Sequence, residues 1–574
     1  MVEIPPSNSG TQSRGSSVEQ ATPWYQHAVF YEVMVRSFFD SDGDGFGDFQ
    51  GLVQKLDYLQ WLGVDALWLP PFYASPLKDG GYDVSDYRSV LDRYGTVDDF
   101  RLLVQEIHRR GLRVVIDLVV NHTSIEHEWF QSSRSDPDGP YGDYYVWRDT
   151  DEGFPNVRII FTDTEESNWA FDDVRRQFYF HRFFSHQADL NFANLRVQEE
   201  ILDVARFWLD MGVDGFRLDA VPYLFESEEG TGESEPETHE FLRRLRAMID
   251  RDYPGRVLLA EANQSPREVA AFFGTEENPE CHMAFDFPVM PRIFYAMRAR
   301  DVSSLEAVLR ESTQIPHGAS WGLFLRNHDE LSLEMVTEEE REALYQWYAP
   351  DPRMRVNVGI RRRLAPLLEN NPAHIELAHA LLLSLKGTPF LYYGDEVGMG
   401  DNIWLDDRDA SRTPMQWTSD PNAGFSEADP GLLYLPVVQS LDNDYRRVNV
   451  AAQVADSDSL LQRIRRLLSV RRAHPVFATG SLVLCEADNA GVLAFIRDDP
   501  SNPPVGTSGG SVLCVFSFLD TAQEVTLRLP EEFSSACVID LFSGGARGSV
   551  SEGRVTMALK ERGFSWCGLT PPSE

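Results

Sequence analysis

Lysine and cysteine are both scarce in this chain of 574 residues. It has four lysines, so nearly all of its 52 basic residues are arginines, and 90 acidic residues leave a net charge of −38. Such a charge repels polyanions, so we expect no nucleic acid and no anionic membrane as a partner. The five cysteines are odd in number and form no C-x-x-C pair, which argues against a disulfide framework or zinc site and favours a reducing, cytoplasmic location.

Long hydrophobic runs are also missing. No stretch reaches 18 uninterrupted apolar residues, so no membrane span is expected. Residues 1–22 are rich in Ser, Gln, Gly and Pro and lack an apolar segment, which predicts a disordered tail and not a signal peptide. Apolar mass is nevertheless abundant, because the chain has 35 Phe, 20 Tyr and 12 Trp. This content excludes disorder as the main state.

Apolar runs of strand character alternate with amphipathic helical patterns from residue 29 onward. Eight runs stand out, at residues 29–35, 64–69, 112–120, 213–220, 257–260, 283–287, 322–325 and 389–393. Strands buried on both faces and separated by helices indicate a parallel sheet, and eight is the number in a TIM barrel. We therefore predict an α/β fold whose catalytic (β/α)8 barrel spans residues 23–122 and 187–479.

Two segments interrupt this alternation, and the end of the chain departs from it. Residues 123–186 follow the third strand and predict an insertion domain, and residues 330–375 follow the seventh strand and predict a smaller, lid-like insertion. Both follow the carboxyl ends of strands, where TIM barrels carry their active sites, so both should shape the pocket. Residues 480–574 alternate short apolar runs with Gly, Ser, Asp and Pro turns, which predicts a C-terminal antiparallel β-sandwich.

Four polar segments stand at predicted strand ends. They are Asp117-x3-Asn121-His122, Gly215-Phe216-Arg217-Leu218-Asp219-Ala220, Glu261-Ala262-Asn263 and Asn327-His328-Asp329. In a barrel these ends converge, so three carboxylates would meet in one pocket. Retaining chemistry on a glycosidic bond needs a carboxylate nucleophile and a carboxyl acid about 5–5.5 Å apart. Arg217 lies on the same strand face as Asp219 and should favour its ionised form. Any one of these acids could equally be a surface or helix-capping residue.

These segments resemble the signature regions of the α-amylase superfamily, glycoside hydrolase family 13, and the likeness extends from about Trp24 to the end of the chain. It implies that Asp219 is the nucleophile, Glu261 the general acid/base and Asp329 a third acid that holds sugar hydroxyls. It also implies substrate-binding roles for further residues, with Tyr82 stacking on the sugar and Asp83 gripping its far hydroxyls: Tyr82, Asp83, His122, Gln187, Arg217, His328 and Arg412.

Two later tracts narrow the resemblance within the family. The segment from Asp409 to Trp417 and the long tract that begins at Tyr348 resemble a branch acting on maltose. This implies retaining, intramolecular transfer that interconverts maltose and α,α-trehalose through a covalent glucosyl-enzyme, with minor hydrolysis to glucose. A retaining α-glucosidase of the oligo-1,6-glucosidase type would use the same acids and is the alternative. A non-catalytic binding relative is disfavoured because all three acids are present. A homo-oligomer and a maltokinase partner both stay open.

One or two structural calcium sites are expected, and no organic cofactor. Acids at positions 1, 3, 5 and 9 of the segment from Asp40 to Asp48 match the front of an EF-hand loop, but position 12 is Gly51, and the alternative is a solvated acidic turn. The predicted ligands are Asp40, Asp42, Asp44, Asp48 and the carbonyl of Phe46. The family resemblance implies a second site with these ligands: Asn121, Asp189, Tyr223, Leu224 and Glu226. Glu226 could instead simply begin a solvated acidic loop.

Overall fold

The computed structural model describes residues 22–312, 315–499 and 510–570, so the predicted tail lies outside the described residues except for Thr22. At its centre is a closed barrel of eight parallel strands. Along the chain these strands are β1 (Phe30–Glu32), β2 (Ala66–Leu69), β5 (Arg113–Val119), β11 (Gly215–Asp219), β12 (Val257–Ala260), β13 (Met283–Phe285), β14 (Ser320–Phe324) and β18 (Thr388–Tyr392). Each lies within or overlaps one of the eight apolar runs, which confirms the predicted barrel.

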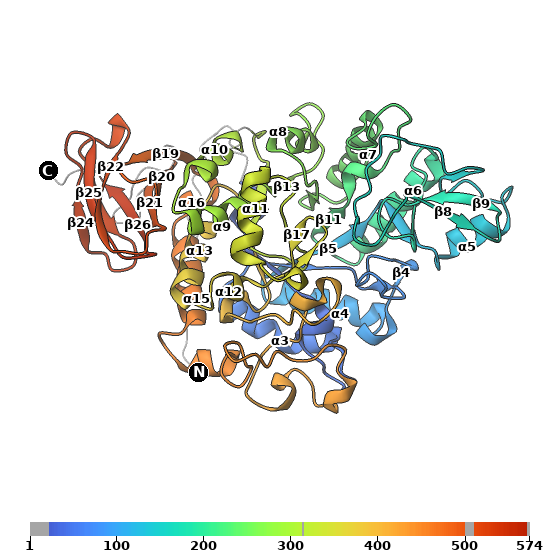
Figure 1. The fold of residues 1–574 in the computed structure, drawn as a ribbon, viewed down its shortest axis with the longest axis horizontal. Helices are drawn as coiled ribbons and strands as arrows, with labels where there is room; N and C mark the ends of the chain where they lie inside the picture. Colours follow the sequence, from blue (N-terminus) through green and yellow to red (C-terminus); the bar gives the residue numbers. More distant parts are fainter. Residues whose placement is uncertain (1–21, 313–314, 500–509, 571–574) are drawn as a thin grey trace, which may run out of the picture.

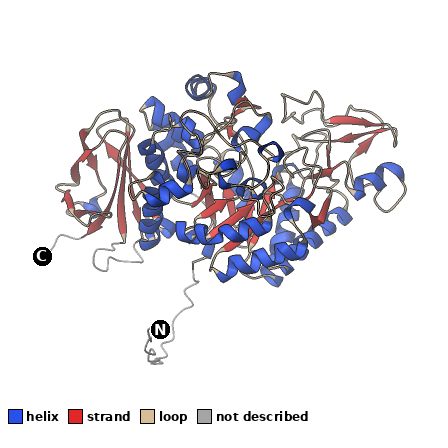
Figure 2. Ribbon diagram, turned by 90° about the horizontal axis from the view of Figure 1, so that it is seen from below, coloured by secondary structure: helices blue, strands red, loops and turns tan. Residues whose placement is uncertain are grey.

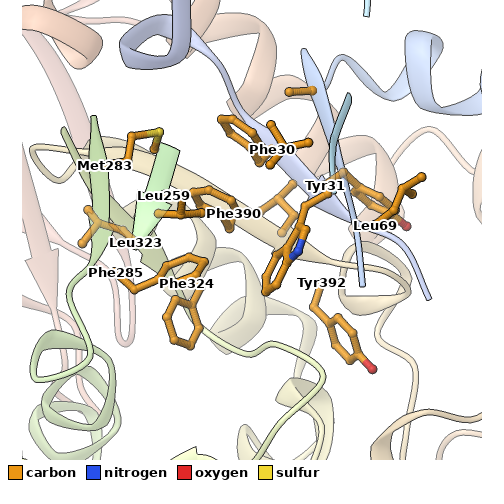
Figure 3. Close-up of a cluster of buried hydrophobic side chains, with 14 of the residues drawn as sticks. Phe30, Tyr31, Leu69, Leu259, Met283, Phe285, Leu323, Phe324, Phe390 and Tyr392 are labelled. Carbon is orange, nitrogen blue, oxygen red and sulfur yellow. The ribbon is translucent and has the colours of Figure 1, made fainter. Parts of the chain in front are cut away.

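Aromatic side chains fill the middle of the barrel. Phe30 of β1 stacks on Phe390 of β18 with ring centroids 4.4 Å apart, and Phe285 of β13 meets the same ring edge-on. Figure 3 shows these rings packed together with aliphatic side chains from other strands. A barrel interior filled in this way is a core and not a channel, so a substrate can enter only at one end.

Helices surround the barrel and begin where the sequence supplies capping groups. Helix α3 (Phe49–Leu62) starts at Asp48, whose side chain accepts from Gly51 N, and ends at Gly63 in the left-handed conformation (φ 102°). The other main barrel helices include α4 (Val97–Arg109), α6 (Leu195–Asp210), α7 (Pro236–Asp252), α9 (Val289–Ala299), α10 (Ser303–Glu311), α13 (Pro372–Ser384) and α15 (Leu460–Ala473). Figure 2 shows helices outside the central strands. Among the described residues, no helix has the length and apolar character needed to span a membrane.

The insertion after the third barrel strand, β5, is joined to the barrel by a two-stranded ribbon. Strands β6 (His122–Ser124) and β10 (Gln187–Asp189) pair antiparallel, with Asp189 opposite His122. Beyond this ribbon lie α5 (Glu128–Ser135) and a small sheet of β7 (Trp147–Arg148), β9 (Gln177–Phe180) and β8 (Trp169–Asp172). The ribbon therefore brings both predicted edges of the insertion to the rim of the barrel.

The insertion after the seventh barrel strand, β14, is smaller. It holds α11 (Glu338–Tyr348) and a three-stranded sheet of β15 (Leu331–Ser332), β17 (Gly359–Ile360) and β16 (Arg355–Val356). We call residues 330–375 the lid. Figure 1 places α11 and β17 near the barrel, with the first insertion at the right-hand end of the molecule.

The C-terminal domain is antiparallel, as predicted, and lies at the end of the molecule opposite the first insertion (Figure 1). Its strands are β19 (Ser481–Ala487), β20 (Val492–Asp498), β21 (Ser511–Ser517), β22 (Gln523–Arg528), β23 (Cys537–Asp540), β24 (Ala546–Ser549), β25 (Arg554–Leu559) and β26 (Phe564–Thr570). Strand β19 pairs with β20 along its first half and with β22 at its end, so it passes from one layer to the other. The short apolar runs of the sequence, at residues 492–496, 512–518, 524–529, 538–542 and 554–559, correspond to β20, β21, β22, β23 and β25, whereas β19, β24 and β26 were not predicted.

One buried arginine ties this domain to the barrel. Arg497 of β20 is fully buried and donates to the carbonyls of Ser384 and Leu385 at the end of α13, each at 2.8 Å. It also donates to the carbonyls of Phe477 and Gly480 at 2.8 and 2.7 Å. The last carbonyls of a helix have no partner within the helix, so Arg497 satisfies groups that burial would otherwise leave unpaired.

Candidate active site

The predicted catalytic residues come together at the carboxyl ends of the barrel strands. Asp219 is the last residue of β11, Glu261 directly follows β12, and Asp329 lies in the loop after β14. Their side chains are 9%, 20% and 21% exposed, so all three reach the edge of a pocket and none lies on the open surface. Three carboxylates from three separate strands thus share one site.

Arg217 is the centre of this site. Its Nη1 donates to Asp219 Oδ1 at 2.7 Å and also to Asp117 Oδ1 on the neighbouring strand β5. Its Nη2 lies 2.5 Å from Glu261 Oε1. One guanidinium therefore bridges Asp219 and Glu261, because a planar fork can donate to two carboxylates at once. This bridge holds the two acids close together and in a fixed relation.

Two opposing effects act on Asp219. Burial raises the pKa of Asp219 well above its ordinary value, and the charges of Glu261 and Asp117 add to the rise, whereas Arg217 lowers it. The predicted influence of Arg217, which favours the ionised form of Asp219, is therefore one of two effects, and burial acts in the opposite direction. Ala220, directly after Asp219, is left-handed (φ 52°), and its N–H donates to Glu261 Oε2 at 3.1 Å. The hydrogen bond from this strained turn helps to hold the carboxylate of Glu261 beside Asp219.

Asp329 has a different environment, rich in cations. Its Oδ2 lies 3.0 Å from His328 Nε2, and its Oδ1 lies 3.2 Å from both Arg408 and Arg412. Burial alone would raise the pKa of Asp329, but these three cations hold it well below its ordinary value. Asp329 is therefore ionised at neutral pH and can accept hydrogen bonds from a sugar.

Most of the predicted substrate residues surround these acids. Tyr82 and His328 lie with parallel rings 5.4 Å apart, and the Tyr82 hydroxyl lies 2.7 Å from His328 Nε2. His122 is buried, and its Nε2 has no hydrogen-bond partner among the residues that the structure describes. Burial lowers the pKa of His122 to about 4, so the ring is neutral. Gln187 Nε2 donates to Asp79, and Arg412 Nε donates to the carbonyl of His328.

Asp83 does not face this site. The residue is fully buried, and its carboxylate accepts from Ser75 Oγ and from the backbone N–H groups of Lys78 and Asp79, at 2.9 to 3.1 Å. The protein itself therefore uses both oxygens of Asp83 to hold the loop. This differs from the prediction, which gave this carboxylate to the sugar.

Two residues of the site, Asp79 and Arg408, were not predicted from the sequence. Arg408 Nη2 donates to Asp79 Oδ1 at 2.9 Å, while its Nη1 donates to Asp329 Oδ1. Both side chains are at least nine-tenths buried. In the sequence, each of the two is visible only as a charged residue close to a family motif. Asp79 lies directly before Gly80, and Arg408 lies four residues before Arg412.

The first predicted metal loop brings only some of its acids together. Carboxylate oxygens of Asp40, Asp42 and Asp48 lie within 4.8 Å of one another. Asp44 instead pairs with Arg93 at 2.9 Å, and the same guanidinium covers the ring of Phe46. Three of the four acids thus fit a shared cation, and the fourth faces away to an arginine.

The second predicted metal site shows a clearer sign of a cation. Within the described part of the chain, Asp189 Oδ2 and Glu226 Oε1 are buried and have no hydrogen-bond partner. Burial raises the pKa of Asp189 to about 7 and that of Glu226 well above its ordinary value, and Asp189 adds to the second shift. Asn121 contacts Asp189, and the loop that leads to Glu226 contains Tyr223 and Leu224. Asp189 Oδ1 accepts from the Arg182 N–H at 2.9 Å, so each carboxylate has one unpartnered oxygen, and carboxylate oxygens are ligands that a hard cation prefers.

Comparison with known proteins decides the family. The model of the alpha amylase catalytic domain matches residues 32–348 and 360–480, and that of the maltogenic amylase C-terminal domain matches residues 482–566. The chain belongs to the alpha-amylase family. The gap between the two matched parts of the catalytic domain falls in the lid, which is where this chain departs from the general pattern.

Individual alpha-amylase family members resemble the chain over nearly its whole length. It is 57% identical to trehalose synthase/amylase TreS of Mycolicibacterium smegmatis, over 96% of this chain and 93% of that protein. It is 54% identical to the trehalose synthase of Pimelobacter sp., over 96% of both chains. Among solved structures, trehalulose synthase MutB from Pseudomonas mesoacidophila has a TM-score of 0.76 at 29% identity, over 96% of this chain and 100% of that one.

In this alpha-amylase family chain, the two insertions meet each other over the active face. Asn357 in the lid donates through its N–H to Asp163 of the first insertion at 2.8 Å. Arg158 of the first insertion pairs with Glu334 of the lid at 3.0 Å. On its other side the lid is held by Arg361, which donates to backbone carbonyls of the loop after β18. The insertions therefore form one connected cover.

Proposed function

We propose that this protein interconverts maltose and α,α-trehalose by transferring a glucosyl unit within the closed pocket. The observation that carries the proposal is the guanidinium of Arg217, which bridges Asp219 and Glu261 at adjacent strand ends. The relatives named trehalose synthase, at 57% and 54% identity, direct the choice of substrate. The connected cover formed by the two insertions supports transfer over hydrolysis, because a sealed site keeps water from the intermediate.

In the proposed mechanism, Asp219 attacks the anomeric carbon of the non-reducing glucose of maltose. Glu261 in its acid form protonates the departing 4-oxygen, so a β-glucosyl ester forms and glucose is freed. The freed glucose turns within the pocket, and its anomeric hydroxyl gives its proton to Glu261 while attacking the ester. Two inversions give an α,α-1,1 bond with net retention. Asp329, held ionised by its three cations, accepts hydrogen bonds from the retained glucosyl ring.

Several groups position the sugar in this proposal. We assign the Asp79–Arg408 pair, in place of Asp83, to the outer hydroxyls, because the pair adjoins Asp329. His122 would supply its unpartnered Nε2. A cytoplasmic location is part of the same proposal, since all five cysteines are free thiols and four of them are buried.

Incubation of the purified enzyme with maltose, followed by NMR, tests the proposed function. We expect trehalose as the main product and glucose as a minor one. Glucose as the main product would leave the three acids in place and would assign the chain to the α-glucosidase alternative. Absence of any conversion would contradict both.

Calcium is proposed as a structural ion, held at the second site by Asp189, Glu226, Asn121 and the carbonyls of Tyr223 and Leu224. It would bind the unpartnered oxygen of each carboxylate and take no part in the reaction. An ion that binds only the folded state stabilises it, by about 2.7 kcal/mol when its concentration is 100 times Kd. The loop of Asp40, Asp42 and Asp48 is proposed as a second, weaker position.

Chelation tests this proposal. We expect EDTA to lower the Tm of the wild-type protein by several degrees and added Ca²⁺ to restore it. The variant Glu226→Gln, which removes one charge, should respond much less, whereas Glu228→Gln, on the exposed side of the same loop, should respond like the wild type. An unchanged Tm together with no bound metal in elemental analysis would exclude both sites.

A further inference from the structure

The strand β1 places a charged residue directly beneath the active site. Glu32, the last residue of β1, is 1% exposed, and its register puts it between Tyr392 of β18 and Trp68 of β2. Its Oε1 lies 2.5 Å from Nδ1 of His328 and accepts from the His328 backbone N–H at 3.3 Å. A buried carboxylate is costly unless it has a partner, and this one is joined to a residue of the site.

The hydrogen-bond partners of His328 determine its protonation state. Glu32 accepts at Nδ1, and the carboxylate of Asp329, 3.0 Å from Nε2, can also only accept. With both carboxylates ionised, each ring nitrogen carries a proton and His328 is an imidazolium. The Tyr82 hydroxyl, 2.7 Å from Nε2, shares the single Nε2 proton with Asp329, since it can accept this proton while it donates to Asp117 Oδ2 at 3.5 Å.

The charged groups around His328 also favour a doubly protonated ring. Burial lowers the pKa of the ring, but Asp329 and Glu32 together raise it to about 9. Asp117 of β5 is a further carboxylate that interacts with this charge, and Tyr82 contacts the ring. Arg412 reaches only the backbone carbonyl of His328, and the Trp68 indole meets the ring edge-on.

We propose that Glu32 is a positioning residue that keeps His328 doubly protonated and thereby fixes Asp329 and Tyr82 for the sugar. Without the charge of Glu32, His328 would lose its second proton at a lower pH. A neutral ring with Nδ1–H facing residue 32 would then present the lone pair of Nε2 to the carboxylate of Asp329. The two groups would repel each other, and Asp329 would leave the position in which it holds the substrate. The activity assay of this role depends on the proposed function, whereas the spectroscopic measurement of the His328 pKa does not.

The variant Glu32→Gln tests the proposal, because glutamine keeps the shape and the acceptor but not the charge. In ¹⁵N NMR of histidine-labelled protein, with the His328 signal assigned by its loss in His328→Gln, we expect the pKa of His328 to fall by about 1–3 units. The pH above which kcat for maltose falls should decrease by the same number of units. Glu32→Asp, which keeps the charge, should restore most of both.

The matched control is Glu396→Gln. Glu396 is also a buried glutamate, but its Oε1 accepts from the hydroxyls of Tyr31 and Tyr58 and does not contact His328. This control should leave the pKa of His328 and the pH profile unchanged. A wild-type pKa of His328 in Glu32→Gln would overturn the proposal whatever the product of the reaction. A shifted pKa in a protein that forms no trehalose would overturn only the proposed function.

Discussion

Replacing Asp219 by alanine is expected to abolish both transfer and hydrolysis, lowering turnover of maltose by about 10⁴-fold or more. In the proposed mechanism both products arise from one ester on Asp219, so no product can form without it. The fold should survive, because the change leaves Arg217 paired with Asp117 and Glu261. Product formation by NMR and Tm by calorimetry measure the two effects separately.

The matched control for this variant is Asp286→Asn. Asp286 directly follows β13 and is equally buried, and burial raises its pKa to about 7, but it makes no contact with Arg217. We expect it to keep its activity. The ester can also be observed directly: with α-glucosyl fluoride, Glu261→Gln should accumulate a protein one glucosyl unit heavier, and Asp219→Ala should not. Near-wild-type turnover in Asp219→Ala would contradict the assignment of the nucleophile.

The second large effect is expected from Arg217, which joins three carboxylates at once. In Arg217→Leu, Asp117, Asp219 and Glu261 lose their shared cation, and the first two of these acids stay buried. Removing one partner of a buried ion pair typically costs about 3–5 kcal/mol, so we expect a large loss of stability in urea unfolding together with loss of activity. Exposed Arg528 in the C-terminal domain provides a control, and Arg528→Leu should change neither.

The variant Arg217→Lys separates the effect on folding from the effect on chemistry. A lysine keeps the charge and should recover much of the stability. Its ammonium is a compact point charge without the planar fork of the guanidinium, so it would not hold Asp219 and Glu261 in the same fixed relation. We expect turnover to stay at least about 100-fold below wild type, by analogy with the loss of one oriented donor. Full recovery of turnover by lysine would show that charge alone is sufficient.

The barrel could be predicted from the sequence because its strands are buried on both faces and read as apolar runs. Two of the strands that were missed, β24 and β26, lack a continuous apolar run. All four residues of β24 are exposed, and β26 mixes serine and glycine with its apolar residues. The order of the strands in the closed sheet follows from the right-handed β–α–β connection, which applies to every such barrel.

The catalytic acids could be predicted because each directly adjoins a strand end, but the outer part of the site could not. Asp79 and Asp83 are four residues apart, and the sequence gives no sign of which one faces the pocket. Gly80 and Gly81 lie between them in left-handed conformations (φ 59° and 109°), so the chain turns and leaves only Asp79 paired with Arg408. Arg408 is 329 positions away from Asp79, and such a pair becomes visible only in the folded chain.

The contact made by Arg497 limits how the C-terminal β-domain can be recombined. Its guanidinium, which belongs to the β-domain, donates to barrel carbonyls at the end of α13 and at Phe477, and to the carbonyl of Gly480 at the junction itself. A chimera that replaces the domain at residue 480 would have to carry over the arginine and the helix end as one unit. If either half came from an unrelated parent, a buried cation or several buried carbonyls would lose their partners. The covalent boundary in the sequence is therefore not the boundary of the cooperative folding unit.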